Sequence, residues 1–194
     1  MCSSDLGVDG VWPPGPDGSG ASLAKLQSNL ATVSPESWAT SEQLGGTPGT
    51  TNFPTLPIAP PNPHIVLNEI APADASTFWI EIFNADSVSI ALQSIEITRG
   101  GSESATLPTR SLEPGGFLIL TRAQLGFGTV DGDILFLRRK SDQALLDAIT
   151  VKPFPRARHP DGLGEWFSHS QVSPGALDRK STRLNSSHLV ISYA

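Results

Sequence analysis

Short apolar runs separated by turn-forming residues dominate the chain from residue 64 onward. Residues 78–83 alternate as a half-buried strand does, with Phe78, Ile80 and Ile82 on one face and Trp79, Glu81 and Phe83 on the other. Further strands are predicted at 65–70, at 90–97 with an interruption near 93–94, at 117–120, 134–137 and 144–151, with a weak edge segment at 106–108. Short strands at this spacing predict an all-β fold, an immunoglobulin-like β-sandwich.

The first part of the chain, residues 7–53, has little periodicity. Residues 21–26 could form one short strand, and Ser34 and Pro35 could begin one helical turn, as N-cap and first helical residue. A glycine-rich stretch at 45–49 should end that turn. The segment buries too little to fold alone, and Trp12 and Trp38 suggest that it packs on something that the fragment lacks. Residues 54–63 follow with five prolines, which favour an extended spacer and predict a domain boundary.

Composition narrows the function. The 194 residues have room for one domain and a fragment, with 38% apolar and 16% charged residues, 18 glycines and 17 prolines. The net charge of −6 argues against a nucleic-acid surface, because such surfaces rely on Lys and Arg. No apolar run reaches the roughly 18 residues of a membrane span, and no signal peptide is visible.

Both ends resemble translated read-through of a common short-read sequencing adapter. The resemblance covers residues 178–194, with the variable index at 189–190, and residues 1–6 at the other end. We therefore expect 1–6 and 178–194 to be adapter-derived and the natural protein to extend beyond both. Cys2, the only cysteine, lies in the first of these segments, so no disulfide is expected. Without them 10 basic and 17 acidic residues remain, a net charge of −7.

A short motif series occurs twice. Residues 160–162 (Pro-Asp-Gly), Gly164, Trp166 and 173–175 (Ser-Pro-Gly) match, in order, residues 16–18 (Pro-Asp-Gly), Gly20, Trp38 and 47–49 (Thr-Pro-Gly). This repeat predicts that 7–53 is the C-terminal tail of a preceding copy of the domain at 64–177.

The order of motifs in 64–177 resembles the lamin tail domain (LTD) of the bacterial extracellular type. These motifs are Asn68-Glu69-Ile70, Trp79-Ile80-Glu81-Ile82-Phe83-Asn84, Leu112-Glu113-Pro114-Gly115-Gly116-Phe117, Gly132-Asp133-Ile134, Leu146-Asp147, Arg158-His159-Pro160-Asp161-Gly162, Trp166 and Pro174-Gly175. One departure is Ser94-Ile95, where the family usually has Gly-Trp. The resemblance implies an immunoglobulin-like sandwich that serves as an accessory module in large secreted or surface proteins.

Paired carboxylates are the first candidate chemistry. Glu69 and Glu81 fall on neighbouring predicted strands and could act as acid and base, or bind calcium with Asp74. We favour a structural role, in which they cap backbone amides or lie at the sheet surface, because no nucleophile or third ligand cluster accompanies them.

The other candidates have simpler interpretations. Residues 131–133 (Asp-Gly-Asp) are typical of a turn, and 115–116 and 162–164 lack the context of a phosphate loop. Three histidines lie too far apart for metal-ligand spacing, namely His64, His159 and His169. The basic residues 138–140 could contact an acidic polymer but suit a hairpin turn, and three tryptophans are more typical of packing anchors than of sugar platforms, namely Trp12, Trp38 and Trp166.

Taken together, these patterns predict a non-catalytic structural or interaction module of a larger secreted or cell-surface protein, whose signal peptide lies outside this fragment. No catalytic, cofactor-binding or metal-binding residues are predicted. The expected partners are neighbouring domains of the same chain, with extracellular proteins or polysaccharides as further candidates. The alternative is a carbohydrate- or ligand-binding module attached to an extracellular enzyme. Hydrolysis by the fragment itself would need Glu69 and Glu81 to face each other in a cleft.

Overall fold

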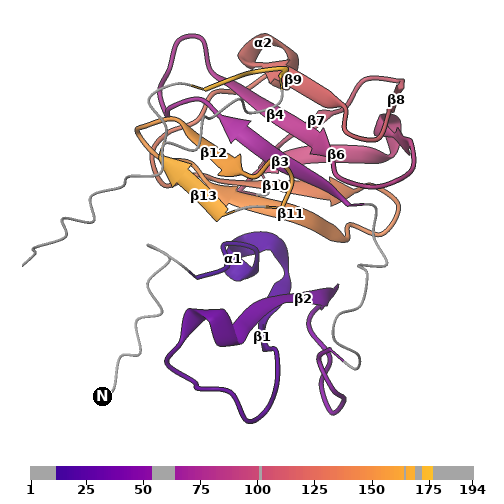
Figure 1. Cartoon of the computed structure of the whole chain (residues 1–194), viewed down its shortest axis with the longest axis vertical. Helices are drawn as coiled ribbons and strands as arrows, with labels where there is room; N and C mark the ends of the chain where they lie inside the picture. The colour runs from indigo at the N-terminus through magenta and orange to yellow at the C-terminus, as the bar shows by residue number, and fades with distance from the viewer. Residues whose placement is uncertain (1–11, 54–63, 101, 164, 169–171, 177–194) are drawn as a thin grey trace, which may run out of the picture.

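The computed structural model describes residues 12–53, 64–100, 102–163, 165–168 and 172–176. Within these ranges the chain is predominantly β-strand, paired in antiparallel sheets with few helices (Figure 1), so the all-β prediction is confirmed. The expectations for residues 1–11, 54–63 and 177–194 lie outside the described residues. None of the described helices has the length and apolar character that would let it cross a lipid bilayer.

Residues 64–176 form two main sheets, which we call the two-sheet unit. The five-stranded sheet has the order β13 (Glu165–Ser168), β12 (Arg156–His159), β3 (Ile65–Ile70), β4 (Trp79–Asn84) and β9 (Phe117–Thr121). The four-stranded sheet has the order β11 (Leu145–Thr150), β10 (Ile134–Arg139), β6 (Ile95–Arg99) and β7 (Glu103–Thr106). A small ladder joins β5 (Ile90–Ala91) to β8 (Ser111–Leu112), and the helices are η2 (Leu92–Ser94) and α2 (Arg122–Leu125).

One hydrophobic core lies between the two main sheets. The five-stranded sheet supplies Ile65, Leu67, Ile80 and Ile82, and the four-stranded sheet supplies Ile97, Leu135, Leu137 and Ile149. Apolar residues at alternate positions reach one face of a strand, so each sheet buries one side against the other. Removal of this apolar area from water is the main favourable term in folding. The alternation expected for 78–83 is confirmed, because Phe78, Ile80 and Ile82 all belong to the core.

The predicted strand at 90–97 is wrong in one respect. Its two halves, β5 and β6, are separated by η2 and belong to different sheets. The chain therefore passes from one sheet to another at the interruption near 93–94. The expected strands at 65–70, 117–120, 134–137 and 144–151 are present as β3, β9, β10 and β11. The weak segment at 106–108 ends the edge strand β7. Strands β8, β12 and β13 were missed, because each is too short for a clear alternation.

Residues 12–53 form a separate N-terminal unit beside the four-stranded sheet (Figure 1). It contains α1 (Pro16–Ser19), β1 (Ala21–Lys25), the 3-10 helix η1 (Pro35–Ser37) and β2 (Trp38–Leu44), with β1 and β2 paired. The short strand and the start of the helical turn are confirmed, although Ser34 makes no side-chain cap. The expectation that residues 45–49 end the turn is wrong, because η1 ends at Ser37 and the unpredicted β2 follows at once. This unit contacts the two-sheet unit, where the Arg138 guanidinium donates to the Ser19 carbonyl, a contact that the sequence did not predict. That its tryptophans pack on a missing part stays a prediction.

Candidate functional site

Glu69 and Glu81 lie side by side on the five-stranded sheet. In the β3–β4 ladder Leu67 pairs with Ile82 and Glu69 pairs with Glu81, so Asn68 is the extra residue of a β-bulge. The bulge shifts the alternation of side chains by one residue. Leu67 and Ile70 can therefore both reach the core, while Glu69 joins Glu81 on the outer face, meaning the face opposite the core.

The two carboxylates are buried although they lie on an outer face. Glu69 is 1% exposed and Glu81 0% exposed. Ser173 donates its backbone N–H to Glu69 Oε2 at 2.9 Å and its hydroxyl to Oε1 at 3.0 Å, and Gly175 donates its backbone N–H to Glu81 Oε2. Two carboxylates of the first strand pair thus cap the backbone of the last described segment, 172–176. The capping role expected from the sequence is confirmed by these bonds.

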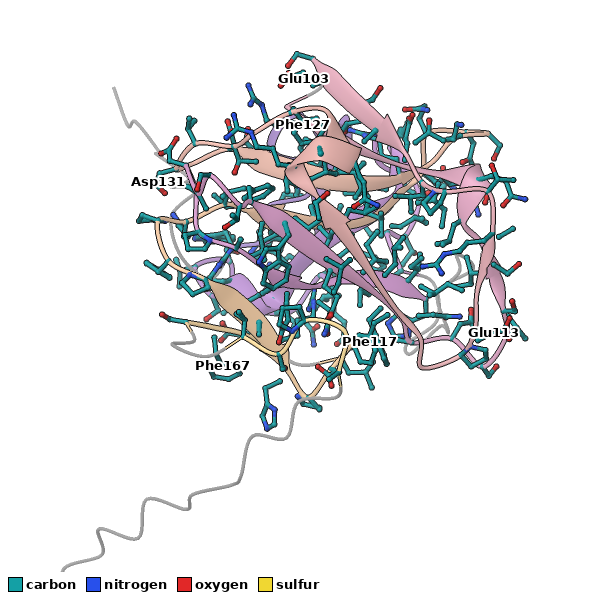
Figure 2. The ribbon with its side chains drawn as sticks, turned by 90° about the horizontal axis from the view of Figure 1, so that it is seen from above. Glu103, Glu113, Phe117, Phe127, Asp131 and Phe167 are labelled. Carbon is teal, nitrogen blue, oxygen red and sulfur yellow. The ribbon has the colours of Figure 1, made fainter. Side chains whose placement is uncertain are left out.

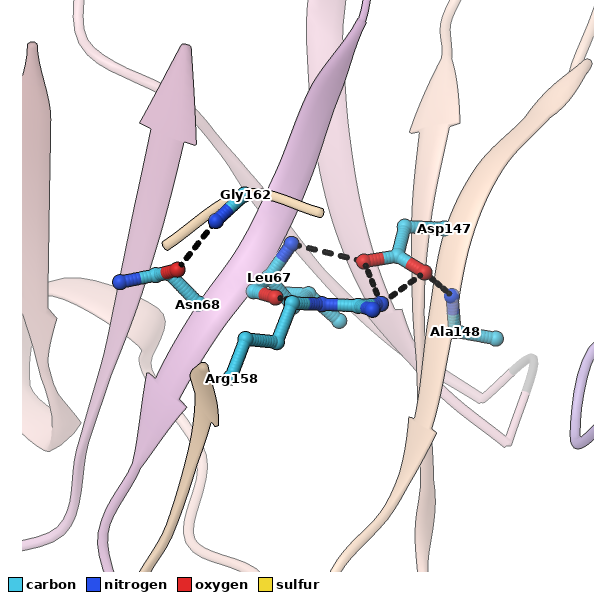
Figure 3. Close-up of polar contacts among 6 residues, drawn as sticks. All are labelled: Leu67, Asn68, Asp147, Ala148, Arg158 and Gly162. Atoms are coloured by element: carbon cyan, nitrogen blue, oxygen red, sulfur yellow. Dashed lines mark hydrogen bonds and ion pairs between the residues drawn. The ribbon is translucent and has the colours of Figure 1, made fainter. Parts of the chain in front are cut away.

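Asn68 links the carboxylates to the Pro-Asp-Gly turn. Its Nδ2 donates to Glu81 Oε1 at 2.9 Å and to Asp161 Oδ1 at 3.0 Å. Its Oδ1 accepts from the Gly162 backbone N–H at 2.9 Å, as Figure 3 shows. A primary amide has two N–H donors and one carbonyl acceptor, and Asn68 uses both kinds. We call Asn68, Glu69, Glu81 and the groups that bond to them the buried polar cluster.

Burial perturbs the titration of Glu81. Desolvation raises the pKa of Glu81 from 4.5 to about 7, against the hydrogen bonds from Gly175 and Asn68, which lower it. The charges of Glu69 and Asp161 raise it further. A carboxyl that titrates near neutral pH is typical of general acids, but a general acid must also reach its substrate. Here protein donors occupy both carboxylates.

One depression on the described surface lies away from this cluster. It is lined by Glu103, Arg122, Ala123, Gly126, Phe127 and Gly128, and includes neither Glu69 nor Glu81. Figure 2 shows Glu103 and Phe127 together beside α2 at one end of the molecule, whereas Phe117 and Phe167 lie in the opposite half. Phe117 packs on Phe83, with ring centroids 4.8 Å apart. A Cβ built on Gly162 would lie 2.5 Å from the Phe83 ring, so the Pro-Asp-Gly turn packs directly against Phe83.

A half-buried ion pair joins the two main sheets (Figure 3). Arg158 Nη2 lies 3.0 Å from Asp147 Oδ2, and both side chains also bond Leu67. Asp147 Oδ2 accepts the Leu67 N–H at 2.8 Å, and Arg158 Nε donates to the Leu67 carbonyl at 2.8 Å. Strand β12 pairs with β3 only at residues 69 and 70 of β3. The side chains of Asp147 and Arg158 therefore bond the Leu67 N–H and carbonyl, which have no partner on β12.

Both members of this ion pair lie in partly desolvated surroundings. Desolvation raises the pKa of Asp147, and the charge of Arg158 opposes that shift. Trp166 lies 4.9 Å from the Arg158 guanidinium and 5.4 Å from that of Arg156, and it packs on the core. Asp147 and Arg158 both occur in the sequence motifs, but no local pattern indicates that they pair.

The remaining acidic, histidine and glycine candidates do not form a site. Residues 131–133 form a turn, in which Asp133 Oδ2 accepts the Val130 N–H at 2.8 Å and Gly132 has φ +89°. Asp74 is exposed in the β3–β4 connection. Gly115 bonds the Asn84 carbonyl through its backbone N–H, as a turn residue does. His169 and Gly164 lie outside the described residues, and no three described His, Cys, Asp or Glu residues are grouped to hold a metal ion.

The basic triplet does not form one patch. Arg138 is buried and bonds Ser19, Arg139 pairs with Asp142 at 2.7 Å, and Lys140 donates to Thr106 Oγ1 at 3.4 Å. Arg138 is therefore covered by protein, whereas Arg139 and Lys140 lie at the hairpin between β10 and β11, and contact with an acidic polymer there stays untested.

The two copies of the repeated motif have related backbone conformations. Gly18 has φ +85° and Gly162 has φ +78°, and a strand begins shortly after each, β1 at Ala21 and β13 at Glu165. The tryptophans of the repeat are not equivalent, however. Trp166 lies on the strand that follows the motif, whereas Trp38 lies on the second strand of its hairpin. All three tryptophans of the repeated tails, Trp12, Trp38 and Trp166, are half-buried.

Comparison of the chain with protein-family models, with curated proteins and with solved structures gave no match.

Proposed function

We propose that this chain is a non-catalytic structural or interaction module, with tandem immunoglobulin-like sandwich domains of the lamin tail kind, from a larger secreted or cell-surface protein. The motif order in the sequence supports the family, and two antiparallel sheets around one core are compatible with it. One observation carries the function. Glu69 and Glu81, the best candidates for chemistry, have their oxygens bonded to the backbone at Ser173 and Gly175.

The buried polar cluster has a clear structural use. The bond from Ser173 to Glu69 spans 104 residues and ties the last described segment to the first strand of the two-sheet unit. Burial of a carboxylate is costly unless hydrogen bonds compensate it, and here the backbone donors do so. The buried polar cluster therefore supports a structural role, in which the two carboxylates hold segment 172–176 against β3 and β4. Catalysis would require oxygens that a substrate can reach.

The substitution Glu69→Gln distinguishes the two roles. Both oxygens of Glu69 accept hydrogen bonds from Ser173, so an amide NH2 in place of one oxygen would face a donor. We expect a loss of about 1–3 kcal/mol in the free energy of unfolding, measured by urea denaturation. Glu113→Gln is the matched control, because Glu113 is exposed and its carboxylate accepts only from the Ser89 hydroxyl in the described contacts.

The same proteins should show no turnover of chromogenic glycosides, esters or peptides. The proposal fails if the unmodified chain hydrolyses one of these substrates and Glu69→Gln abolishes the activity while its stability stays equal to that of Glu113→Gln.

A carbohydrate-binding role remains the second candidate, supported by two exposed aromatic residues. Phe154 is 42% exposed and Phe167 is 49% exposed. Phe167 lies on β13 and Phe154 precedes β12, its partner strand. A glycan array probed with the whole chain tests this role. Binding that Phe167→Ala abolishes would favour it, and silence across the array would leave the structural module.

A further inference from the structure

The outer face of the four-stranded sheet carries a large apolar residue that no water reaches. Along β10, Leu135 and Leu137 point into the core, so Phe136 and Arg138 point to the opposite side. Yet Phe136 is 0% exposed and Arg138 only 7% exposed. Another part of the chain must cover them, and that part is the N-terminal unit, through the turn at Pro16–Gly20.

The contacts in this interface are specific. Arg138 Nη2 donates to the Ser19 carbonyl at 2.9 Å, Nη1 donates to the Gln143 carbonyl at 3.2 Å, and the guanidinium lies 5.0 Å from the Phe136 ring. A buried guanidinium is costly without such partners, so the Ser19 carbonyl is a required acceptor. A Cβ built on Gly18 would lie 3.8 Å from Phe136 Cζ, so the turn passes directly over the ring.

Glycine also permits the close approach beside β11. A Cβ built on Gly15, which precedes the repeated motif, would lie 2.4 Å from Thr40 Oγ1 of the same unit and 2.9 Å from Leu145 Cδ2 on β11. Gly18 has φ +85°, a conformation that side chains disfavour. The interface therefore recognises the backbone of a glycine-containing turn.

The turn that docks is the first copy of the repeated motif. Pro16-Asp17-Gly18-Ser19-Gly20 matches Pro160-Asp161-Gly162-Leu163-Gly164 in sequence. Ser19 bonds Arg138 through its backbone carbonyl, while its hydroxyl accepts the Ala21 N–H at 2.9 Å. Leu163 stands at the same place in the second copy. Leu163 is 72% exposed, whereas Ser19 is 6% exposed under the interface.

We propose that the outer face of β10 and β11, centred on Phe136 and Arg138, is a docking face for the Pro-Asp-Gly-x-Gly turn of a preceding copy of the domain. Consecutive copies are thereby held head to tail in a fixed arrangement. This inference rests on the proposed function as a tandem module and adds the surface through which neighbouring copies interact.

A cleavable linker tests the docking face in the intact chain. A protease site placed within residues 54–63 allows the folded protein to be cut, after which size-exclusion chromatography and titration report whether the two pieces stay together. We expect co-elution at micromolar concentration. Arg138→Ala should weaken the association about tenfold or more, because a buried charge-assisted hydrogen bond is lost. Arg139→Ala is the control, since Arg139 pairs with Asp142.

The turn itself can be tested in the same assay. A synthetic peptide spanning residues 13–25 should displace the N-terminal piece, and the peptide with Gly18→Val should not. The proposal is overturned if both pieces keep their circular dichroism but separate after cleavage, or if Arg138→Ala and Arg139→Ala bind equally well.

Hydrogen exchange on the uncut chain covers the case in which a piece unfolds after cleavage. Arg138→Ala should speed amide exchange in the N-terminal unit at least tenfold while Arg139→Ala leaves it unchanged. Equal exchange in the two variants would overturn the docking face. That outcome would leave the Glu69→Gln stability and turnover results unchanged. The docking face can therefore be refuted without refuting the proposed function.

Discussion

Asn68→Asp is the sharpest perturbation of the buried polar cluster. The substitution keeps the size of the side chain but replaces its NH2 group with an oxygen. That NH2 donates to Glu81 Oε1 and to Asp161 Oδ1. The variant therefore loses two hydrogen bonds and places a third carboxylate between two others.

The size of the loss follows from these contacts. A hydrogen bond to a charged group contributes about 1.5–3 kcal/mol, so two of them amount to at least about 3 kcal/mol at pH 8. The repulsion between the introduced carboxylate and its two neighbours adds to this loss. Natural domains have only about 5–15 kcal/mol of net stability, so the change should be large in any unfolding measurement.

The loss should depend on pH. The pKa of Glu81 is raised from 4.5 to about 7, so the folded state holds this proton more tightly than the unfolded chain does. The contribution of Glu81 to stability is greatest below pH 4.5 and falls as the pH rises from there to about 7. At pH 5.5 Glu81 is protonated in the folded state and can donate to the introduced carboxylate. Part of the stability lost by Asn68→Asp at pH 8 should therefore return.

Urea denaturation at pH 8.0 and 5.5 measures both effects. Asn29→Asp is the matched control, because Asn29 is exposed and the charge change is the same. A loss below about 1 kcal/mol at pH 8, or one equal to that of Asn29→Asp, would refute the account of the cluster. An unchanged difference between the two variants at pH 5.5 would refute the assignment of the pH dependence to Glu81.

Two further substitutions test the supports around the cluster. Arg158→Ala leaves the half-buried Asp147 without its cation and should cost about 1–3 kcal/mol, while the double variant with Asp147→Ala should cost less than the sum of the single ones in a urea double-mutant cycle. Gly162→Ala should lower the melting temperature more than Gly115→Ala, because both have positive φ but only the first would push a methyl group against Phe83; equal shifts would contradict the close packing of this turn.

Several features follow from local sequence alone. The alternation of residues 78–83 determines that Glu81 faces away from the core, because successive side chains of a strand point to opposite sides. Repeated short apolar runs between glycine- and proline-rich turns determine an all-β chain, and Pro35 marks the helical turn at 35–37 correctly. A structural role for Glu69 and Glu81 could also be predicted from the sequence, since carboxylates without a nucleophile or ligand cluster are typically structural.

Pairing between residues far apart in the chain cannot be predicted from any short stretch of the sequence. The bulge at Asn68 brings Glu69 beside Glu81, and only the ladder between β3 and β4 reveals it. The division of 90–97 between two ladders is likewise invisible, because its apolar residues fit one interrupted strand as well as two.

The sequence by itself therefore determined the strand content, the faces of the longer strands and the repeated motif. The tertiary structure decided which backbone amides the two glutamates cap, which edge the Asp147–Arg158 pair closes, and what lies over Phe136 and Arg138. The physical reason is the range of each effect. Burial periodicity acts within a few residues, whereas the bond from Ser173 to Glu69 joins groups 104 residues apart, and its existence depends on how the whole chain closes.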